Sequence, residues 1–318
     1  MSTLVIVEHD RGTLAPATLE ALTAARALGD SVEALSIGAA ADGLAAELAA
    51  YGAAAVHLVH HDLLSDYGPE AWGDVVAQAV RSLQPTAVLA CGTDRGNEVM
   101  AQAAARLDLP MVANVLSVEP GDTWTITRVR WGGSLLEQCT LAATTKLLTV
   151  SHHAFEAVES PAAGEVASLA VDLDPSLART VVTERVERAA GVTLATAPFV
   201  VGGGRGVGSA EAFAPLEELA SALGGVVGCS RAVTNNGWRN HTDQVGQTGT
   251  RIAPDLYIAC GISGAIQHWV GAMASKKILA INIDAEANMV TKADYAVIGD
   301  LHKVVPAITE EIQRRRGA

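Results

Sequence analysis

Cysteine is scarce in this chain of 318 residues, which contains four. Cys91, Cys139, Cys229 and Cys260 lie far apart, with no CxxC pair and no histidine at metal-ligand spacing. Because small disulfide scaffolds and zinc sites both need closely spaced ligands or paired cysteines, the sequence favours neither. We expect four buried thiols and no metal.

Positive charge and long apolar runs are also lacking. The chain has 22 Lys and Arg against 35 Asp and Glu, a net charge of −13, and a nucleic-acid backbone would repel such a surface. No stretch reaches the roughly 18 uncharged apolar residues of a membrane span, and the start lacks the basic and apolar regions of a signal peptide. We therefore expect a cytoplasmic protein that does not bind nucleic acid.

Apolar residues make up 49% of the chain, enough for two ordinary cores. In the first half, short apolar runs at 4–8, 32–37, 55–59 and 87–91 alternate with Ala-rich helical stretches, which predicts a mostly parallel sheet. Between 112 and 150, β-rich runs with glycine-containing turns predict antiparallel strands added to that sheet.

The fold class predicted is therefore α/β with two domains. The acidic, proline-containing stretch 160–197 mixes weak strand signals with a charged segment and is the expected connection. We assign residues 1–190 to an N-terminal Rossmann-like domain and residues 191–318 to a C-terminal doubly wound parallel sheet.

The second half shows small or polar residues directly after each predicted strand. The strands are expected at 198–203, 226–229, 256–261, 278–283 and 295–299, with helices at 210–223, 264–273 and 303–315. The segments GGRG, SR, ISG, NID and D follow the five strands in turn. Ligands of open parallel sheets bind beyond the carboxyl ends of the strands, so this pattern favours a binding cleft there.

Single motifs in this half leave more than one interpretation. The loop GGGRGVGS at 202–209 lacks the GK[ST] ending of a hydrolytic P-loop and is either an anion site helped by Arg205 or a plain turn. Ser263 is expected to cap a helix, with His268 one turn in. The loop QVGQTG at 244–249 suits the edge of a planar heterocycle or is a polar turn.

Other chemistry has weaker support. Arg231, after Ser230, is either a cation over a ring or part of a surface ion pair. The pairs His60-His61 and His152-His153 are expected on the solvated surface. There is no GxSxG and no cysteine beside a base, so the chain does not look like a hydrolase.

The stretch LYIACGISGAIQHWVGAMASKKILAIN at 256–282 resembles the signature of the electron-transfer flavoprotein alpha subunit, and DQVGQTG precedes it as in that family. With GGRG, SR and DLHKVVP, the resemblance extends over about residues 198–312. The first domain matches the family in its alternation of strands and helices. The sequence departs from the family pattern at 238–240 and 283–289.

The resemblance implies FAD held without a covalent bond by the second domain, and a heterodimer in which the first domain contacts a beta subunit and itself holds no ligand. Such a protein is an electron carrier, not an enzyme. It takes electrons from flavoprotein dehydrogenases, such as acyl-CoA dehydrogenases in fatty acid beta-oxidation, and passes them to a membrane-associated quinone oxidoreductase.

Three alternatives stay open. The first is the alpha subunit of an electron-bifurcating NADH-linked complex. The second is an NAD-dependent enzyme on the same nucleotide-binding fold, and the third is a scaffold whose cofactor site is vestigial. The loop GTDRGNE at 92–98 in the first domain looks like a nucleotide loop, but the resemblance implies that this domain is empty.

The resemblance also implies a set of FAD-binding positions. They are Arg205, Ser230, Arg231, Val245, Gly246, Gln247, Thr248, Ser263, Gly264, Ala265, Ile266, Gln267, His268, Asn282, Asp300 and Leu301.

Roles follow from the same resemblance. Arg205 would neutralise the pyrophosphate, residues 263–265 and Asn282 would contact the phosphates and ribityl chain, and Asp300 with Leu301 would lie at the adenosine end. Thr248 would sit near N5 of the flavin.

Two further side chains would favour negative charge on the flavin ring. Arg231 would lie against the ring and His268 near the C2 carbonyl, so with Thr248 they would tune the redox potential.

Overall fold

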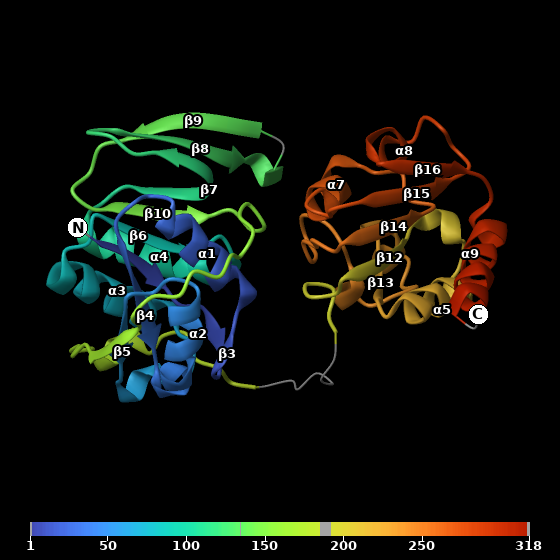
Figure 1. Cartoon of the computed structure of the whole chain (residues 1–318). Helices are drawn as coiled ribbons and strands as arrows, with labels where there is room; N and C mark the ends of the chain where they lie inside the picture. The colour runs from blue at the N-terminus through green and yellow to red at the C-terminus, as the bar shows by residue number, and fades with distance from the viewer. Residues whose placement is uncertain (1, 134, 185–191, 317–318) are drawn as a thin grey trace. The chain divides into compact units, whose positions relative to one another are not determined.

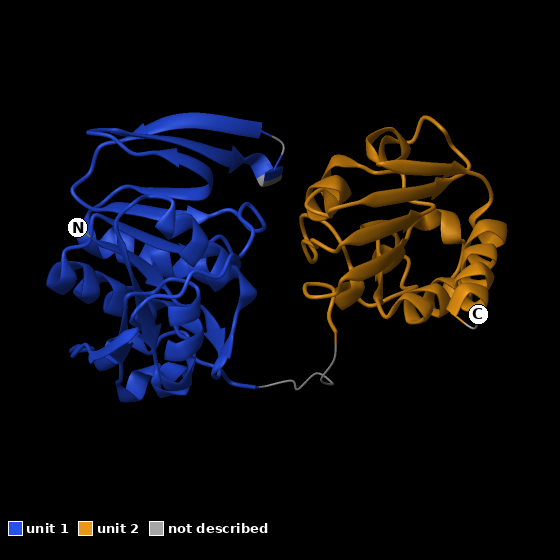
Figure 2. Cartoon of the chain, in the orientation of Figure 1, with its two compact units in different colours: residues 1–187 blue, residues 188–318 orange. Residues whose placement is uncertain are grey.

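The computed structural model describes residues 2–133, 135–184 and 192–316. The chain divides into two compact units, Met1–Glu187 and Arg188–Ala318 (Figure 2). The boundary predicted between residues 190 and 191 lies outside the described residues. Each unit is described by itself.

The first unit is built on a nine-stranded sheet of described residues, in the order β11-β5-β4-β1-β6-β10-β7-β8-β9 (Figure 1). The strands from β11 to β7 are mutually parallel, and β8 and β9 add antiparallel to β7. The bounds are β1 Ser2–Ile6, β4 Ser31–Ile37, β5 Ala55–Val59, β6 Ala87–Cys91, β7 Met111–Glu119, β8 Trp124–Arg130, β9 Leu135–Leu141, β10 Lys146–Val150 and β11 Glu165–Ser168. This confirms the predicted mostly parallel sheet with antiparallel additions.

Helices cover both faces of the central strands of this sheet, which are therefore buried on both sides. One core lies under α1 (Pro16–Arg26) and α2 (Ala45–Ala50), and the other under α3 (Pro69–Leu83) and α4 (Asp94–Leu107). A two-residue hairpin, β2 (His9–Asp10) with β3 (Thr13–Leu14), follows β1.

The stretch predicted as an interdomain connection contains a strand. β11 pairs in parallel with β5, and Leu169 N–H donates to the Leu58 carbonyl at 2.9 Å. All four side chains of β11 are exposed, so backbone hydrogen bonds alone add it to the sheet edge. The weak strand signals expected in 160–197 thus include a strand, and the division between the two units still falls within this stretch.

The second unit holds a five-stranded sheet of described residues, entirely parallel, in the order β13-β12-β14-β15-β16. The strands are β12 Phe199–Gly203, β13 Val226–Cys229, β14 Leu256–Cys260, β15 Ile278–Asn282 and β16 Tyr295–Ile298. Since β12 and β14 are neighbours while β13 lies on the outer side of β12, the chain reverses its winding between them. This confirms the doubly wound sheet.

Two helix layers enclose that sheet (Figure 1). One core contains α5 (Ala214–Leu223) and α9 (Leu301–Arg316), and the other contains α7 (Ile266–Ala272) and α8 (Asn288–Lys292). The short α6 (Arg231–Asn235) follows β13. Among the described residues, no helix combines the length and the apolar composition that crossing a membrane requires.

Two predicted helix starts were too early. The loop after β12 forms 3₁₀ turns at Arg205–Val207 and Glu211–Phe213, and α5 begins only at Ala214, with a proline in its first turn. Helix α7 begins at Ile266 because Gly264 has φ +76°, outside the helical region. Ser263 is therefore not the N-cap, which is Ala265.

Candidate functional site

A cleft of about 1010 Å³ lies in the second unit, lined by residues that follow each of the five strands. Its lining includes Arg205 and Gly206 after β12, Ser230 and Arg231 after β13, residues 261–265 with Gln267 and His268 after β14, residues 282–284 after β15, and residues 299–302 after β16. The volume is at the upper end of the 300–1,000 Å³ of typical ligand pockets. The small and polar residues that follow the five strands in the sequence therefore line one cleft.

The two loops at the switch point touch backbone to backbone. Gly204 N–H donates to the Cys260 carbonyl at 2.8 Å, and Gly206 N–H donates to the Gly261 carbonyl at 3.1 Å. A Cβ on Gly204 would come within 2.2 Å of the Gly261 carbonyl oxygen. Glycine is thus required for close packing here.

The loop before α7 rests against the start of α8 in the same way. Met289 N–H donates to the Ser263 carbonyl at 3.2 Å. A Cβ on Gly264 would lie 2.3 Å from Met289 N. Gly264 thus combines a left-handed backbone with a contact that excludes any side chain.

The charged groups of the cleft include two guanidiniums. Arg205 and Arg231 are exposed, and in the described parts of the chain neither takes part in an ion pair. Such guanidiniums suit a phosphate or a planar ring. Asp300 is exposed, and its carboxylate accepts the backbone N–H of His302 at 3.0 Å.

Asn282 organises the loop that follows β15. Its Nδ2 donates to the Ile262 carbonyl at 3.1 Å, and its Oδ1 accepts the Asp284 N–H at 3.1 Å. Each oxygen or amide group retains capacity for one more partner. Asn282 therefore links the ends of β14 and β15 at the cleft.

His268 lines the cleft but is only 7% exposed. Its Nε2 lies 2.8 Å from the hydroxyl oxygen of Tyr257, and within the described residues its Nδ1 is buried without a hydrogen-bond partner. Burial lowers the pKa of His268 to about 4, against a smaller opposing effect of the Val245 backbone. The imidazole is thus neutral at pH 7, so it acts on a ligand through an N–H dipole and not through positive charge.

The loop between Gln244 and Thr250 does not contribute to the cleft lining. Gln244 Nε2 donates to the Thr248 hydroxyl at 2.9 Å, while Gln247 N–H donates to the Gln267 carbonyl at 2.7 Å. Thr248 is exposed, and Val245 is 1% exposed within the core. This loop adjoins two residues of the cleft lining, Gln267 through the Gln247 N–H and His268 through the Val245 backbone.

The predicted site residues thus divide into two groups. Those that line the cleft are Arg205, Ser230, Arg231, Ser263, Gly264, Ala265, Gln267, His268, Asn282, Asp300 and Leu301; those that do not are Val245, Gly246, Gln247, Thr248 and Ile266.

The sequence interpretation missed Tyr257, Gly206, Gly261 and His302. The two glycines follow strands and were visible in that pattern. Tyr257 lies inside β14, where its residue type signals only burial.

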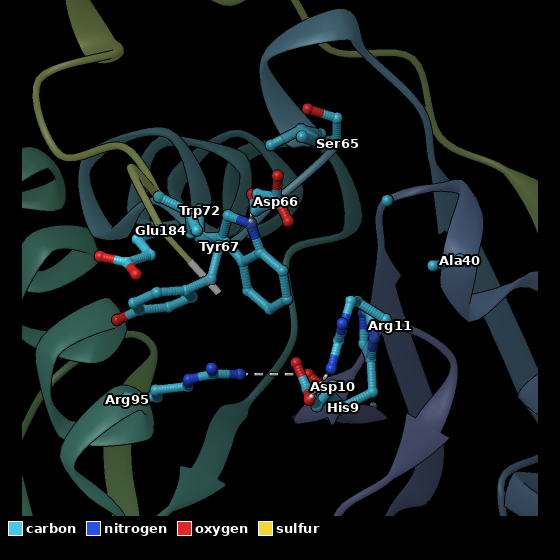
Figure 3. A pocket seen from close by; sticks show the side chains of 13 residues that line it. His9, Asp10, Arg11, Ala40, Ser65, Asp66, Tyr67, Trp72, Arg95 and Glu184 are labelled. Carbon is cyan, nitrogen blue, oxygen red and sulfur yellow. Dashed lines mark hydrogen bonds and ion pairs between the residues drawn. The ribbon is translucent and has the colours of Figure 1, made fainter. Parts of the chain in front are cut away.

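The first unit has a smaller pocket of about 290 Å³ beyond the ends of β1 and β4 (Figure 3). The guanidinium of Arg95 stacks 4.9 Å from the ring centre of Tyr67, and Arg11 pairs with Asp10 at 3.2 Å. His9 Nε2 lies 2.8 Å from the Ile37 carbonyl oxygen. Arg95, Arg11 and His9 thus each have an interaction partner within this unit. The expectation that this unit holds no ligand stays a prediction.

The pair His152-His153 is half-buried rather than solvated, so that prediction was wrong. The carboxylate of Glu20 accepts the backbone N–H of His153 at 2.9 Å, and its other oxygen lies 3.1 Å from the Nδ1 of His153. The two imidazole rings stack with centres 4.0 Å apart and planes 14° apart. One metal ion cannot lie in both ring planes, as imidazole ligation requires. The cluster instead holds the loop after β10 through the contacts between Glu20 and His153.

Of the four cysteines, Cys91, Cys229 and Cys260 are buried as expected, while Cys139 is half-buried.

Together, the two sheets and the cleft at the carboxyl ends of the second one define a two-unit α/β protein with a candidate ligand site in its second unit. Family comparison agrees. Residues 3–175 match the electron transfer flavoprotein domain, and residues 193–273 match the electron transfer flavoprotein FAD-binding domain. The chain belongs to the electron transfer flavoprotein alpha-subunit family.

Curated relatives match along nearly the whole chain. The electron transfer flavoprotein subunit alpha of Mycobacterium tuberculosis (strain H37Rv) is 40% identical and that of Mycobacterium leprae 38%, each over 99% of both chains. The Bacillus subtilis subunit is 36% identical over 98% of this chain and 97% of its own. The match to a solved structure, a thiamine diphosphate-dependent 4-hydroxybenzoylformate decarboxylase of Rhodococcus jostii, covers 98% of this chain and 59% of that chain. Its sequence identity of 13% and TM-score of 0.24 are too low to indicate a shared fold or function.

Proposed function

We propose that this chain is the FAD-carrying alpha subunit of an electron-transfer flavoprotein and acts as a one-electron carrier with no substrate chemistry of its own. The observation that carries the proposal is the cleft at the carboxyl ends of the strands of the second unit, whose lining includes Arg205, Arg231 and His268. When bound, FAD supplies a group that accepts and releases single electrons.

The donor set fits a dinucleotide. Arg205 supplies positive charge for the pyrophosphate, and the backbone of 263–265 offers N–H groups where Gly264 leaves no side chain in the way. Asn282 takes the ribityl and phosphate region, with Asp300 and Leu301 toward the adenosine. Ser230, Arg231, Gln267 and His268 surround the flavin ring.

The loop Val245–Thr248 and Ile266 are proposed to complete the ring's polar edge, with Thr248 near N5. Their support is the hydrogen bond from Gln247 to Gln267, which joins the loop to a cleft residue.

The proposed partners follow from the family. The first unit, 1–190 in the predicted division, contacts a beta subunit, and the second, 191–318, holds FAD. Electrons come from flavoprotein dehydrogenases such as acyl-CoA dehydrogenases and leave to a membrane-associated quinone oxidoreductase. An electron-bifurcating complex is distinguished by a second flavin per heterodimer and by reduction with NADH.

Co-expression of the chain with its beta subunit tests the proposal. We expect a yellow heterodimer with a flavin absorption spectrum. Denaturation should release one FAD per heterodimer. A colourless protein that binds NAD would favour a dehydrogenase instead. Folded protein that takes up neither cofactor would indicate a scaffold.

Removing either polar group near the ring should lower the flavin potential. Arg231→Ala removes a positive charge and His268→Ala removes an N–H donor, so the reduced, more negative flavin loses stabilisation. For Arg231→Ala we expect a fall of about 60 mV, since that corresponds to roughly 1.4 kcal/mol in a one-electron couple. Spectroelectrochemical titration of the heterodimer measures it.

The matched control is Arg314→Ala, which removes the same charge from α9, where Arg314 pairs with Glu311 at 2.7 Å. Its potential should equal that of the wild type. A potential that stays constant in Arg231→Ala, or rises, would contradict the assigned role.

A further inference from the structure

Tyr257 has a buried hydroxyl that contacts His268, a residue of the cleft lining. It lies in β14, is fully buried, and its hydroxyl oxygen is 2.8 Å from His268 Nε2. Burial raises the pKa of this phenol well above its ordinary value of 10, so the hydroxyl keeps its proton. Within the described residues, His268 is the one hydrogen-bond partner of that hydroxyl.

That proton determines which nitrogen of His268 carries hydrogen. A phenol proton needs an acceptor, and a neutral imidazole has one acceptor nitrogen and one N–H. If Nε2 carried the hydrogen, the Tyr257 proton would be buried without an acceptor. Nε2 therefore accepts, and Nδ1 bears the hydrogen.

The surroundings keep this pair uncharged and closely packed. Burial raises the pKa of the Cys229 and Cys260 thiols to about 12, so no thiolate competes for the proton. A Cβ on Gly202 would come within 2.2 Å of the Tyr257 hydroxyl oxygen. The absence of a side chain at 202 thus leaves the space that the phenol occupies.

We propose that Tyr257 is a positioning residue that fixes His268 as the Nδ1–H tautomer and so presents that N–H to the cofactor. The proposal rests on the proposed function for the identity of the recipient. His268 lines the cleft, and its Nδ1 makes no hydrogen bond of good geometry within the described residues, while the Val245 backbone, which raises the pKa of His268, is the competing acceptor for that N–H. The recipient is a hydrogen-bond acceptor on the edge of a flavin ring.

The tautomer is measured first without flavin. The ¹⁵N and ¹H correlations of histidine side chains distinguish Nδ1–H from Nε2–H, and the signal missing in His268→Gln identifies His268 in the flavin-free heterodimer. We expect Nδ1–H in the wild type and an increased fraction of Nε2–H in Tyr257→Phe. Nε2–H in the wild type, or an unchanged tautomer in Tyr257→Phe, would overturn the proposal.

Gly202→Ala is a second route to the same result. Its added methyl group should displace the phenol from His268 and so increase the fraction of Nε2–H, while Tyr257 itself remains in the chain. Tyr295→Phe is the control, because Tyr295 is 61% exposed, and it should leave the His268 signal unchanged.

The flavin-loaded heterodimer gives an independent measurement. Tyr257→Phe should shift the potential in the same direction as His268→Ala, and combining the two should add nothing further because they act through one N–H. Additive shifts would overturn the proposal. If the tautomer responds but no flavin binds, the proposed function fails while the role of Tyr257 in fixing His268 stands.

Discussion

Gly264→Ala should bind FAD at least a hundredfold more weakly than the wild type. The residue has φ +76°, which costs an L side chain about 1–2 kcal/mol. In addition, the new Cβ would lie 2.3 Å from Met289 N and 2.7 Å from Met289 Cα, so the loop or α8 must move. A hundredfold loss corresponds to about 2.8 kcal/mol, which these two effects together reach.

Titration of FAD into the flavin-free heterodimer gives the dissociation constant. Gly237→Ala is the matched control, since Gly237 has φ +71° but nothing within 4 Å of an added Cβ. It shares the backbone cost without the contact and should bind FAD as the wild type does. Binding by Gly264→Ala within threefold of wild type would show that the cleft tolerates a displaced α8.

The sheets were predictable because apolar runs of strand length alternate with helical stretches in both halves. The cleft was predictable for a related reason: parallel strands end at one edge, so residues such as Arg205, Arg231 and Asn282 must approach one another. Neither inference required knowledge of side-chain packing.

What failed depended on backbone geometry or on long-range packing. Ser263 lost its expected role as a cap because Gly264 turns into the left-handed region. The position of the 244–250 loop depends on Gly246, whose Cα would lie 2.3 Å from a Cβ on Gly271. A contact between two glycines leaves no signal in residue type.

The neutral state of His268 was unpredictable for the same reason. The sequence placed the histidine one turn into a helix, where a lone histidine is either a surface residue or a core residue with a hydrogen-bond partner. Its burial, and the phenol of Tyr257 behind it, follow from how α7 packs on β14.

The burial of His268 should make the flavin-free chain less stable in mild acid. Its pKa is about 4 when folded, below the ordinary 6.5, so the unfolded chain takes up the proton first as pH falls. The stabilisation is complete above pH 6.5 and is lost as pH falls toward 4. Between pH 7 and pH 5 we expect a loss of about 2 kcal/mol from this residue.

Urea unfolding of the wild type and of His268→Gln at both pH values isolates this contribution. Groups elsewhere, such as Glu8, whose pKa burial raises, titrate alike in both proteins and cancel in the difference. The glutamine variant should therefore lose about 2 kcal/mol less on acidification. Equal losses would mean that the imidazole accepts a proton without unfolding, and a doubly protonated ring could not accept the hydrogen bond from Tyr257 on which the Nδ1–H assignment depends.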